Sequence, residues 1–362
     1  MSGLRRASHV LLAAVLAACG PGATPRPGSP EPAAPTPSGP SGEPSASPPP
    51  SPASPVPSGP TYTNPVYAGD FPDPHVILVG ETYYAYSTNS GTSNVPTIRS
   101  TDLVTWERVG DAMPALPRWS PPNFGNTWAP GVIQLGERFV LYFVARDAAS
   151  NRQCIGVATS EAPEGPFRDA LDRPLVCQVD LGGSIDPYPF RDADGRLYLF
   201  WKNDGNCCGK PVGLWVQPLA DDGLALTGEP VEVLRRDQAW EIPLIENPAM
   251  VLDAGRYYLF YSGNWWESLD YAVGYAVCET VTGPCEKPLD EPLFKYTAEV
   301  MGPGGQAFFV DRKGNLWMAY HAWTGPNVGY PGGARSLRIE PVRFEDGRPV
   351  IPGPTSTPQP LP

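Results

Sequence analysis

The sequence predicts an all-β fold, a five-bladed β-propeller that follows a short apolar segment and a proline-rich linker. A glycine-led turn followed by an aromatic strand occurs five times at nearly equal spacing. No convincing helical periodicity separates the copies, and a proline precedes each one. A fixed period that contains several strands is typical of propeller blades.

Residues 1–19 resemble the signal sequence of a bacterial lipoprotein. Arg5 and Arg6 precede an apolar run from Val10 to Ala18, which is too short to span a bilayer. The run ends in Leu-Ala-Ala-Cys-Gly, so we expect Cys19 to be lipidated and to become the first mature residue. An ordinary secretory signal is the alternative. We therefore expect export, with anchoring to the outer face of the bacterial cell membrane or secretion.

Residues 20–60 read as a disordered linker, with 16 prolines among 41 residues and little that could form a core. Residues 61–362 contain no second linker and are long enough for one large core. The net charge of −12 and the lack of a basic cluster argue against nucleic acid as a partner. We expect a monomer that binds carbohydrate and contacts a membrane only through its lipid anchor.

Five glycines lead the repeated segments and are 56, 59, 60 and 59 residues apart: Gly80, Gly136, Gly195, Gly255 and Gly314. Each begins a turn that leads into a strand rich in aromatic and aliphatic residues. A β-sandwich with similar hairpins is the alternative, but near-equal spacing argues against it. We predict five blades, with the residues just before each repeated strand lining a central funnel.

The prolines that precede the repeats are Pro74, Pro130, Pro187, Pro248 and Pro303. Directly before these prolines, or one residue earlier, three blades carry a carboxylate: Asp73, Asp186 and Glu246. An aspartate before proline often only starts a turn. At equivalent positions of a rotationally repeated scaffold, however, the three acids should converge on the axis, which favours a functional site.

Such a group of acids is suited to glycoside hydrolysis. One carboxylic acid protonates the leaving oxygen, and a second carboxylate activates water or attacks the anomeric carbon. Mutual repulsion raises the pKa of one acid, so it can stay protonated near neutral pH. Acids from the first and fourth blades should lie roughly 6.5–9.5 Å apart, which predicts inversion, whereas about 5 Å would predict retention.

Five segments in blade order together resemble glycoside hydrolase family 43: Asn64–Val66 with Gly69–Pro74, Thr127–Pro130, Ser184–Pro187, Glu246–Met250 and Tyr320–Trp323. The resemblance implies that Asp73 is the general base, Asp186 tunes pKa and orientation, and Glu246 is the general acid. Glu241 is the rival acid, although only Glu246 is in register with a blade proline.

The sequence departs from the family pattern at two points. Gly131 stands where many relatives carry an aspartate, and the turn Gly302–Gly305 lacks a histidine that is often found there. The resemblance also implies that His321 helps to hold a hydrated structural calcium in the central channel, with a buried hydrogen-bonded histidine as the alternative. The predicted reaction requires no cofactor.

Sugar rings pack their C–H faces on aromatic planes, so Trp128, Trp265 and Trp266 are candidate substrate contacts, with a core role as the alternative. We assign Asp70 and Asn247 to the same site. Arg335 resembles a family arginine that reaches sugar hydroxyls and the catalytic carboxylates, with a surface salt bridge as the alternative.

Six cysteines remain after Cys19, an even number that suggests disulfides outside the cytosol. We predict Cys278–Cys285 across a turn and Cys154–Cys177 within one repeat. Cys207 and Cys208 either form a vicinal bridge or stay reduced. Zinc is disfavoured, because the chain has only three histidines.

The segments around Lys202–Gly205 and Tyr261–Asn264 resemble those of α-L-arabinofuranosidases that release single arabinoses. We therefore predict an inverting, exo-acting enzyme for arabinose-containing plant polysaccharide or oligosaccharide. A β-D-xylosidase and an endo-arabinanase are the alternatives within the family, and a fructoside-cleaving relative is disfavoured because no cysteine follows Glu246. A non-catalytic surface sugar-binding lipoprotein is the alternative of another class.

Overall fold

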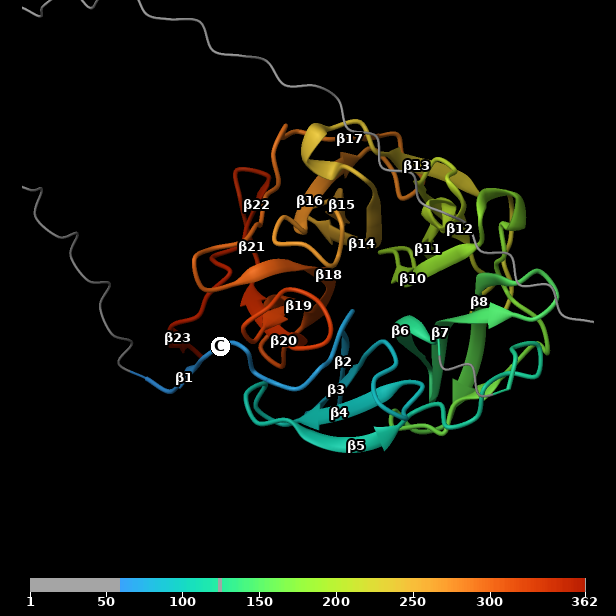
Figure 1. The fold of residues 1–362 in the computed structure, drawn as a ribbon, viewed down its shortest axis with the longest axis horizontal. Coiled ribbons are helices and arrows are strands. Elements are labelled where there is room, and N and C mark those ends of the chain that lie inside the picture. Colours follow the sequence, from blue (N-terminus) through green and yellow to red (C-terminus); the bar gives the residue numbers. More distant parts are fainter. Residues whose placement is uncertain (1–58, 123–125, 362) are drawn as a thin grey trace, which may run out of the picture. The chain divides into compact units, whose positions relative to one another are not determined.

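The computed structural model describes residues 59–122 and 126–361. The predicted signal with Cys19, and the predicted linker except for its last two residues, lie outside the described residues. The described residues form one compact unit. Within it, five antiparallel sheets are arranged around a central axis (Figure 1), which confirms the predicted propeller.

The first four blades have four strands each, in chain order from the axis outward. Blade one is β2 (His75–Val79), β3 (Thr82–Tyr86), β4 (Pro96–Ser100) and β5 (Glu107–Asp111). Blade two is β6 (Trp128–Leu135), β7 (Arg138–Asp147), β8 (Arg152–Ser160) and β9 (Arg168–Asp169). Blade three is β10 (Ser184–Arg191), β11 (Leu197–Asn203), β12 (Gly213–Pro218) and β13 (Val231–Arg235). Blade four is β14 (Ile245–Asp253), β15 (Arg256–Gly263), β16 (Ala272–Cys278) and β17 (Cys285–Glu286).

Blade five has three strands, β18 (Met301–Val310), β19 (Leu316–Thr324) and β20 (Ala334–Pro341). A hairpin follows, β21 (Arg343–Glu345) with β22 (Arg348–Val350), and β1 (Thr61–Tyr62) pairs with β23 (Gln359–Pro360). The helices of the described ranges are three short 3₁₀ turns, η1 (Val179–Leu181), η2 (Gly205–Cys208) and η3 (Ala239–Glu241). Within these ranges, no helix has the length and hydropathy needed to cross a membrane.

The glycine-led repeats form the second strand of each blade, and the strand before each glycine is the innermost one. A second strand is covered on both faces by neighbouring blades, so it can be apolar throughout. In β7, for example, Phe139 and Leu141 pack toward blade one, whereas Val140 and Tyr142 pack toward blade three. The period-two alternation of a strand thus builds the core between blades.

The start of the domain closes the ring against its last blade. The Val66 N–H donates to the Leu337 carbonyl oxygen at 3.0 Å, and the Leu337 N–H donates to the Tyr67 carbonyl oxygen at 3.1 Å. One turn later the Phe71 N–H donates to the Arg335 carbonyl oxygen at 2.7 Å. This pairing places Asp70 and Arg335, which are 265 residues apart in sequence, at the same end of the propeller axis.

Candidate active site

The innermost strand of every blade begins with the same backbone feature. The residue directly before each blade proline has a left-handed backbone, with φ values of 51°, 39°, 57°, 50° and 54° at Asp73, Ala129, Asp186, Asn247 and Gly302. The pairing of four of these strands with their neighbours also shifts register at this point. Non-glycine residues adopt this conformation rarely, and they concentrate at functional sites. The shared backbone gives the predicted site residues equivalent positions around the axis.

The three predicted carboxylates line one pocket of about 540 Å³ at the mouth of the propeller. All six of the predicted substrate contacts line it as well: Asp70, Trp128, Asn247, Trp265, Trp266 and Arg335. Trp265 is 39% exposed, as an open sugar platform would be. Asp186 and Glu246 are each only 7% exposed, so their carboxylates lie at the buried end of the pocket.

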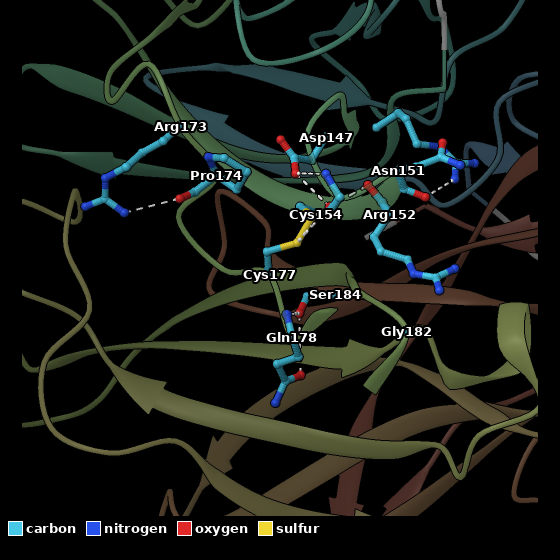
Figure 2. The surroundings of a disulfide bond; sticks show 12 residues. Asp147, Asn151, Arg152, Cys154, Arg173, Pro174, Cys177, Gln178, Gly182 and Ser184 are labelled. Carbon is cyan, nitrogen blue, oxygen red and sulfur yellow. Dashed lines mark hydrogen bonds between the residues drawn. A yellow bond between two sulfur atoms is a disulfide. The ribbon is translucent and has the colours of Figure 1, made fainter. Parts of the chain in front are cut away.

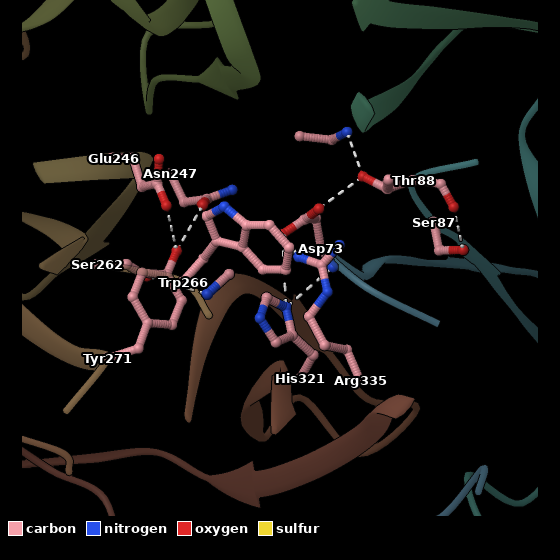
Figure 3. Close-up of polar contacts among 12 residues, drawn as sticks. Asp73, Ser87, Thr88, Glu246, Asn247, Ser262, Trp266, Tyr271, His321 and Arg335 are labelled. Atoms are coloured by element: carbon pink, nitrogen blue, oxygen red, sulfur yellow. Dashed lines mark hydrogen bonds and ion pairs between the residues drawn. The ribbon is translucent and has the colours of Figure 1, made fainter. Parts of the chain in front are cut away.

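Asp73 is held by groups from two other elements (Figure 3). The Thr88 hydroxyl donates to Oδ2 at 2.6 Å, and the Arg335 guanidinium lies 3.6 Å from Oδ1. The Asp73 N–H donates to His321 Nδ1 at 3.0 Å. The Thr88 hydroxyl oxygen also accepts from the Ala129 N–H at 2.8 Å, so it links the first two blades. These contacts fix the orientation of the Asp73 carboxylate.

Glu246 is held by side chains other than those that hold Asp73. Lys202 Nζ donates to Glu246 Oε2 at 3.0 Å, and the Tyr271 hydroxyl donates to Oε1 at 2.9 Å. Lys202 and Tyr271 are fully buried. Burial would lower the pKa of Lys202, but the charges of Glu246 and Asp186 outweigh it and raise that pKa. Lys202 is therefore a buried cation at the base of the acidic pocket.

Asp186 is the carboxyl with the most perturbed acidity in the pocket. Its Oδ2 accepts from the Asn247 N–H at 3.1 Å. Burial, followed by the negative charge of Glu246, raises the pKa of Asp186 to about 8, and Lys202 opposes that rise. Asp186 thus keeps its proton at neutral pH, beside the Glu246 carboxylate.

Arg335 is 9% exposed and reaches into the pocket, so it is not a surface residue. Its guanidinium lies over the Trp266 ring, 4.6 Å from the centroid. Asp70 Oδ1 accepts from the Arg335 N–H at 2.9 Å and from the Tyr330 hydroxyl at 2.7 Å. Trp266 stacks on Trp323 with ring centroids 6.0 Å apart. Trp266 and Arg335 therefore form a fixed wall beside Asp73.

His321 lies within β19, fully buried, and its ring stacks on that of Tyr271. Burial and the nearby Arg335 charge hold the pKa of His321 well below its usual value, so the ring is neutral. Because Nδ1 accepts the Asp73 N–H, the ring proton lies on Nε2, which leaves no free nitrogen lone pair for a metal. The described residues also contain no cluster of three or more His, Cys, Asp or Glu side chains suited to a metal. They do not fit direct calcium ligation by His321.

Glu241, the rival acid, has a different environment from Glu246. It is fully buried, lies 2.7 Å from Lys287 Nζ and accepts from the Tyr261 hydroxyl at 2.7 Å. Its other oxygen accepts from the Asp237 and Gln238 N–H groups. Glu241 does not line the pocket that holds the three acids. These contacts indicate a structural carboxylate that caps η3.

Gly131, where the chain departs from the family pattern, has no room for a side chain. A Cβ at this position would lie 2.6 Å from the Pro187 carbonyl oxygen and 2.6 Å from Pro189 Cδ. The backbone of blade three thus occupies the space that an aspartate would need. In this chain the departure is required by the packing of blade two against blade three.

The structure forms the two predicted disulfides and also the Cys207–Cys208 bridge, which the sequence left open. Cys154–Cys177 joins β8 to the segment before η1 (Figure 2), and Cys278–Cys285 joins β16 to β17. Cys207 and Cys208 are bonded to each other in η2. Cys207 also lines the pocket, which sequence spacing did not predict.

The sequence did not predict three partners of the acids: Lys202, Tyr271 and Thr88. Lys202 had one sequence signal, because it is a single cation in an otherwise apolar strand. Tyr271 and Thr88 had none, since each lies outside the repeated motifs.

Comparison with known proteins agrees with this site. The family described as glycosyl hydrolases family 43 matches residues 62–349. The chain belongs to glycoside hydrolase family 43. It is therefore a glycosidase, an enzyme that hydrolyses O-glycosyl bonds.

Several relatives of this family 43 enzyme have described activities. An extracellular exo-α-(1→5)-L-arabinofuranosidase of Cellvibrio japonicus is 30% identical over 68% of this chain and 72% of its own length. A β-D-galactofuranosidase of Aspergillus niger is 28% identical over 70% of this chain and 74% of its own. A putative β-xylosidase of Xylanibacter ruminicola is 26% identical and is covered over 50% of its length.

Solved structures give the same family and fold. A thermostable family 43 glycoside hydrolase matches with a TM-score of 0.75 and 32% identity, covering 83% of this chain and 99% of that one. An endo-1,4-β-xylanase from Bacteroides thetaiotaomicron matches with a TM-score of 0.68 and 30% identity, covering 80% and 97%. These relatives act on different sugars, so the specific activity has to be argued from the site.

Proposed function

We propose that this family 43 enzyme is an inverting, exo-acting α-L-arabinofuranosidase for arabinose-containing plant polysaccharide or oligosaccharide. The main observation is that one pocket holds Asp73, Asp186 and Glu246 in different environments. Asp73 accepts from a hydroxyl and lies beside a guanidinium, whereas Glu246 and Asp186 form a buried pair beside Lys202. Different surroundings are what separate acid and base roles.

Asp73 acts as the general base in this proposal. Thr88 and Arg335 hold its carboxylate in one orientation, which allows an oxygen to take a proton from the attacking water. Water then attacks the anomeric carbon from the face opposite the leaving group. The product has the inverted configuration, as expected when acid and base are separated by a water.

Glu246 acts as the general acid and Asp186 supports it. Asp186 retains its proton at neutral pH, and in the enzyme–substrate complex Glu246 delivers a proton to the leaving oxygen as the glycosidic bond breaks. Tyr271 and Lys202 hold the Glu246 carboxylate and stabilise the negative charge that the transfer leaves on it. Asp186 fixes the backbone next to Glu246 through the Asn247 N–H.

The sugar is proposed from the aromatic walls and from the relatives. Trp128, Trp265 and Trp266 line the pocket, and they offer planes for the C–H face of a pentose. Two of the relatives are described as enzymes for furanosides, arabinofuranosides and galactofuranosides. This supports a furanoside over the xylopyranoside of a β-xylosidase, the main alternative, with an endo-arabinanase as the third.

A substrate panel tests the sugar. The wild-type enzyme should hydrolyse nitrophenyl α-L-arabinofuranoside faster than the β-D-xyloside and the β-D-galactofuranoside. Digestion of linear arabinan should release arabinose from the first minutes, because an exo-acting enzyme removes terminal units. Early release of mixed oligosaccharides would instead favour an endo-arabinanase, and faster xyloside cleavage would favour a β-xylosidase.

Leaving groups distinguish the two catalytic roles. Glu246→Gln should lose about 10³-fold or more in kcat on arabino-oligosaccharides but far less on a dinitrophenyl arabinofuranoside, whose leaving group needs no proton. Asp73→Asn should lose activity equally on both substrates, since water must be activated in each case. Equal losses for both variants on both substrates would contradict the assignment. Full activity of Glu246→Gln on every glycoside would leave only a sugar-binding role for the pocket.

We also propose export with lipidation at Cys19. Two relatives are described as extracellular, the arabinofuranosidase of Cellvibrio japonicus and an endo-α-(1→5)-L-arabinanase of Thermotoga petrophila. Labelled fatty acid should enter the wild-type protein in a bacterial host and be absent from Cys19→Ala. Equal labelling of both proteins, or none in either, would contradict the anchor.

A further inference from the structure

A second cavity adjoins the catalytic pocket over the junction of blades one and two. It has a volume of about 820 Å³, larger than the catalytic pocket and within the range of small-molecule sites. Asn89 and Gly91 line both cavities. The two spaces therefore adjoin at the turn of residues 89–94.

That turn is fixed to the catalytic machinery on its inner side. The Ser90 hydroxyl donates to Asp70 Oδ2 at 3.2 Å, and Asp70 in turn accepts from the Arg335 N–H. The Asn89 N–H donates to the Thr127 carbonyl oxygen at 2.8 Å, one residue before Trp128. A ligand that touches the turn is thus held at a defined position relative to the reacting sugar.

The opposite wall is the connection between β5 and β6 and is equally fixed. Residues 114–122 carry Trp119, which is 9% exposed and stacks on Phe143 of β7 with ring centroids 6.0 Å apart. The Ala148 N–H donates to the Trp119 carbonyl oxygen at 2.9 Å. Three prolines of this segment line the cavity and stiffen it. The cavity is therefore formed before any ligand binds.

The lining chemistry fits a neutral, hydroxyl-rich ligand. It includes no acidic side chain and a single cation, Arg118, whereas the catalytic pocket is strongly acidic. Thr92, Ser93 and Asn94 offer hydroxyl and amide groups, and Leu116 with the prolines offers apolar surface. Ser120 is 5% exposed, and its buried hydroxyl finds no hydrogen-bond partner in the described ranges. Buried hydroxyls without partners are uncommon, and a small rotation of this side chain toward the cavity would let the hydroxyl contact a ligand.

We propose that this second cavity binds further pentose units of the same saccharide chain whose terminal unit is cleaved in the catalytic pocket. The inference rests on the proposed function, because it takes the substrate to be a chain of neutral sugars. It assigns Thr92 and Ser120 to substrate binding outside the catalytic pocket. It also implies that the enzyme prefers oligosaccharides to small aryl glycosides.

Thr92→Trp tests the proposal by filling the cavity from an exposed position. Its kcat/KM on a linear arabinopentaose should fall by about tenfold or more, while kcat/KM on nitrophenyl arabinofuranoside should stay within about twofold. Ser120→Ala should act in the same direction and more weakly. Thr101→Trp, exposed at the far end of β4, is the matched control and should change neither value. Equal effects of Thr92→Trp on both substrates, or no effect on either, would overturn the proposal.

Calorimetry separates this proposal from the choice of sugar. In a Glu246→Gln background, which blocks turnover, a pentasaccharide of arabinose or of xylose should bind more tightly than the disaccharide of the same sugar. Adding Thr92→Trp should abolish the difference. If xylose chains show this pattern and no arabinofuranoside is cleaved, the proposed sugar fails and the second cavity stands. Equal affinity for short and long chains of both sugars refutes the cavity, whatever the enzyme cleaves.

Discussion

Lys202→Met tests how the pocket keeps a proton near neutral pH. Lys202 is fully buried, and its Nζ lies 3.0 Å from Glu246 Oε2. Burial and the charge of Glu246 raise the pKa of Asp186 to about 8, and the Lys202 cation opposes that rise. Methionine has a similar unbranched stem without the charge, so it fills most of the space while removing the opposition.

The sign and size of the effect follow from the geometry. The proton on Asp186 is lost as pH rises through the raised pKa of this residue, so wild-type activity should fall above about pH 8. Without the Lys202 charge, a state in which Asp186 and Glu246 are both ionised is less favourable. Asp186 therefore loses its proton at a higher pH. At the 3.0 Å that separates Lys202 Nζ from Glu246 Oε2, unit charges interact by about 5 kcal/mol at an effective dielectric constant of about 20, which bounds the effect of the same cation on the neighbouring Asp186. Relaxation and entering water reduce this upper bound, so we expect the pKa to rise by at least about one unit.

The assay is kcat/KM on an aryl glycoside between pH 5 and pH 10. The alkaline limb of Lys202→Met should lie at least about one unit above that of the wild type, whatever the change in the maximal rate. Lys295→Met is the matched control. Lys295 also lies 3.0 Å from a carboxylate, that of Glu291, but these side chains are 53% and 73% exposed, and the limb should not move. A limb of Lys202→Met that stays in place or moves down would refute the reasoning.

Three further substitutions test other parts of the site. Glu241→Gln should lower the free energy of unfolding by about 3–5 kcal/mol in urea titrations, because it disrupts a buried ion pair. It should change kcat only a few-fold, because that ion pair lies outside the pocket. Normal stability with kcat nearly abolished would make Glu241 the acid. Arg335→Met should lower kcat/KM by about 10²-fold, since it frees the Asp73 carboxylate, and unchanged kcat/KM would contradict that role. Gly131→Asp should reduce the free energy of unfolding by about 1–3 kcal/mol through its clash with blade three, and wild-type stability would show that the clash is relieved.

The sequence contained most of the fold because the repeated signals are local. A glycine turn and the alternating strand after it can be recognised within seven residues, and five copies at equal spacing define the blades. What the repeats do not reveal is their place within a blade. In the structure the glycine-led strands are the second strands of their blades. Their place could not be predicted, because a second strand buried on both faces and an innermost strand have similar composition.

The site was predictable only where it follows the repeat. Asp73 and Asp186 occupy the same left-handed position of their blades, so their register could be read from the prolines. Glu246 lies one residue earlier than this position, which Asn247 occupies. The partners that tune the acids come from elsewhere, Thr88 from the loop after β3 and Tyr271 from the residue before β16. Such pairings depend on long-range packing, so nothing in the local sequence indicated them.

The configuration of the first sugar released tests most directly the claim that Asp73 and Glu246 act as base and acid around one water molecule. Proton NMR can follow the anomers within the first minutes of hydrolysis, before mutarotation mixes them. We predict that the product first appears in the configuration opposite to that of the substrate. A product that first appears with the substrate's own configuration would contradict the account, because it would require a covalent intermediate on one of these carboxylates.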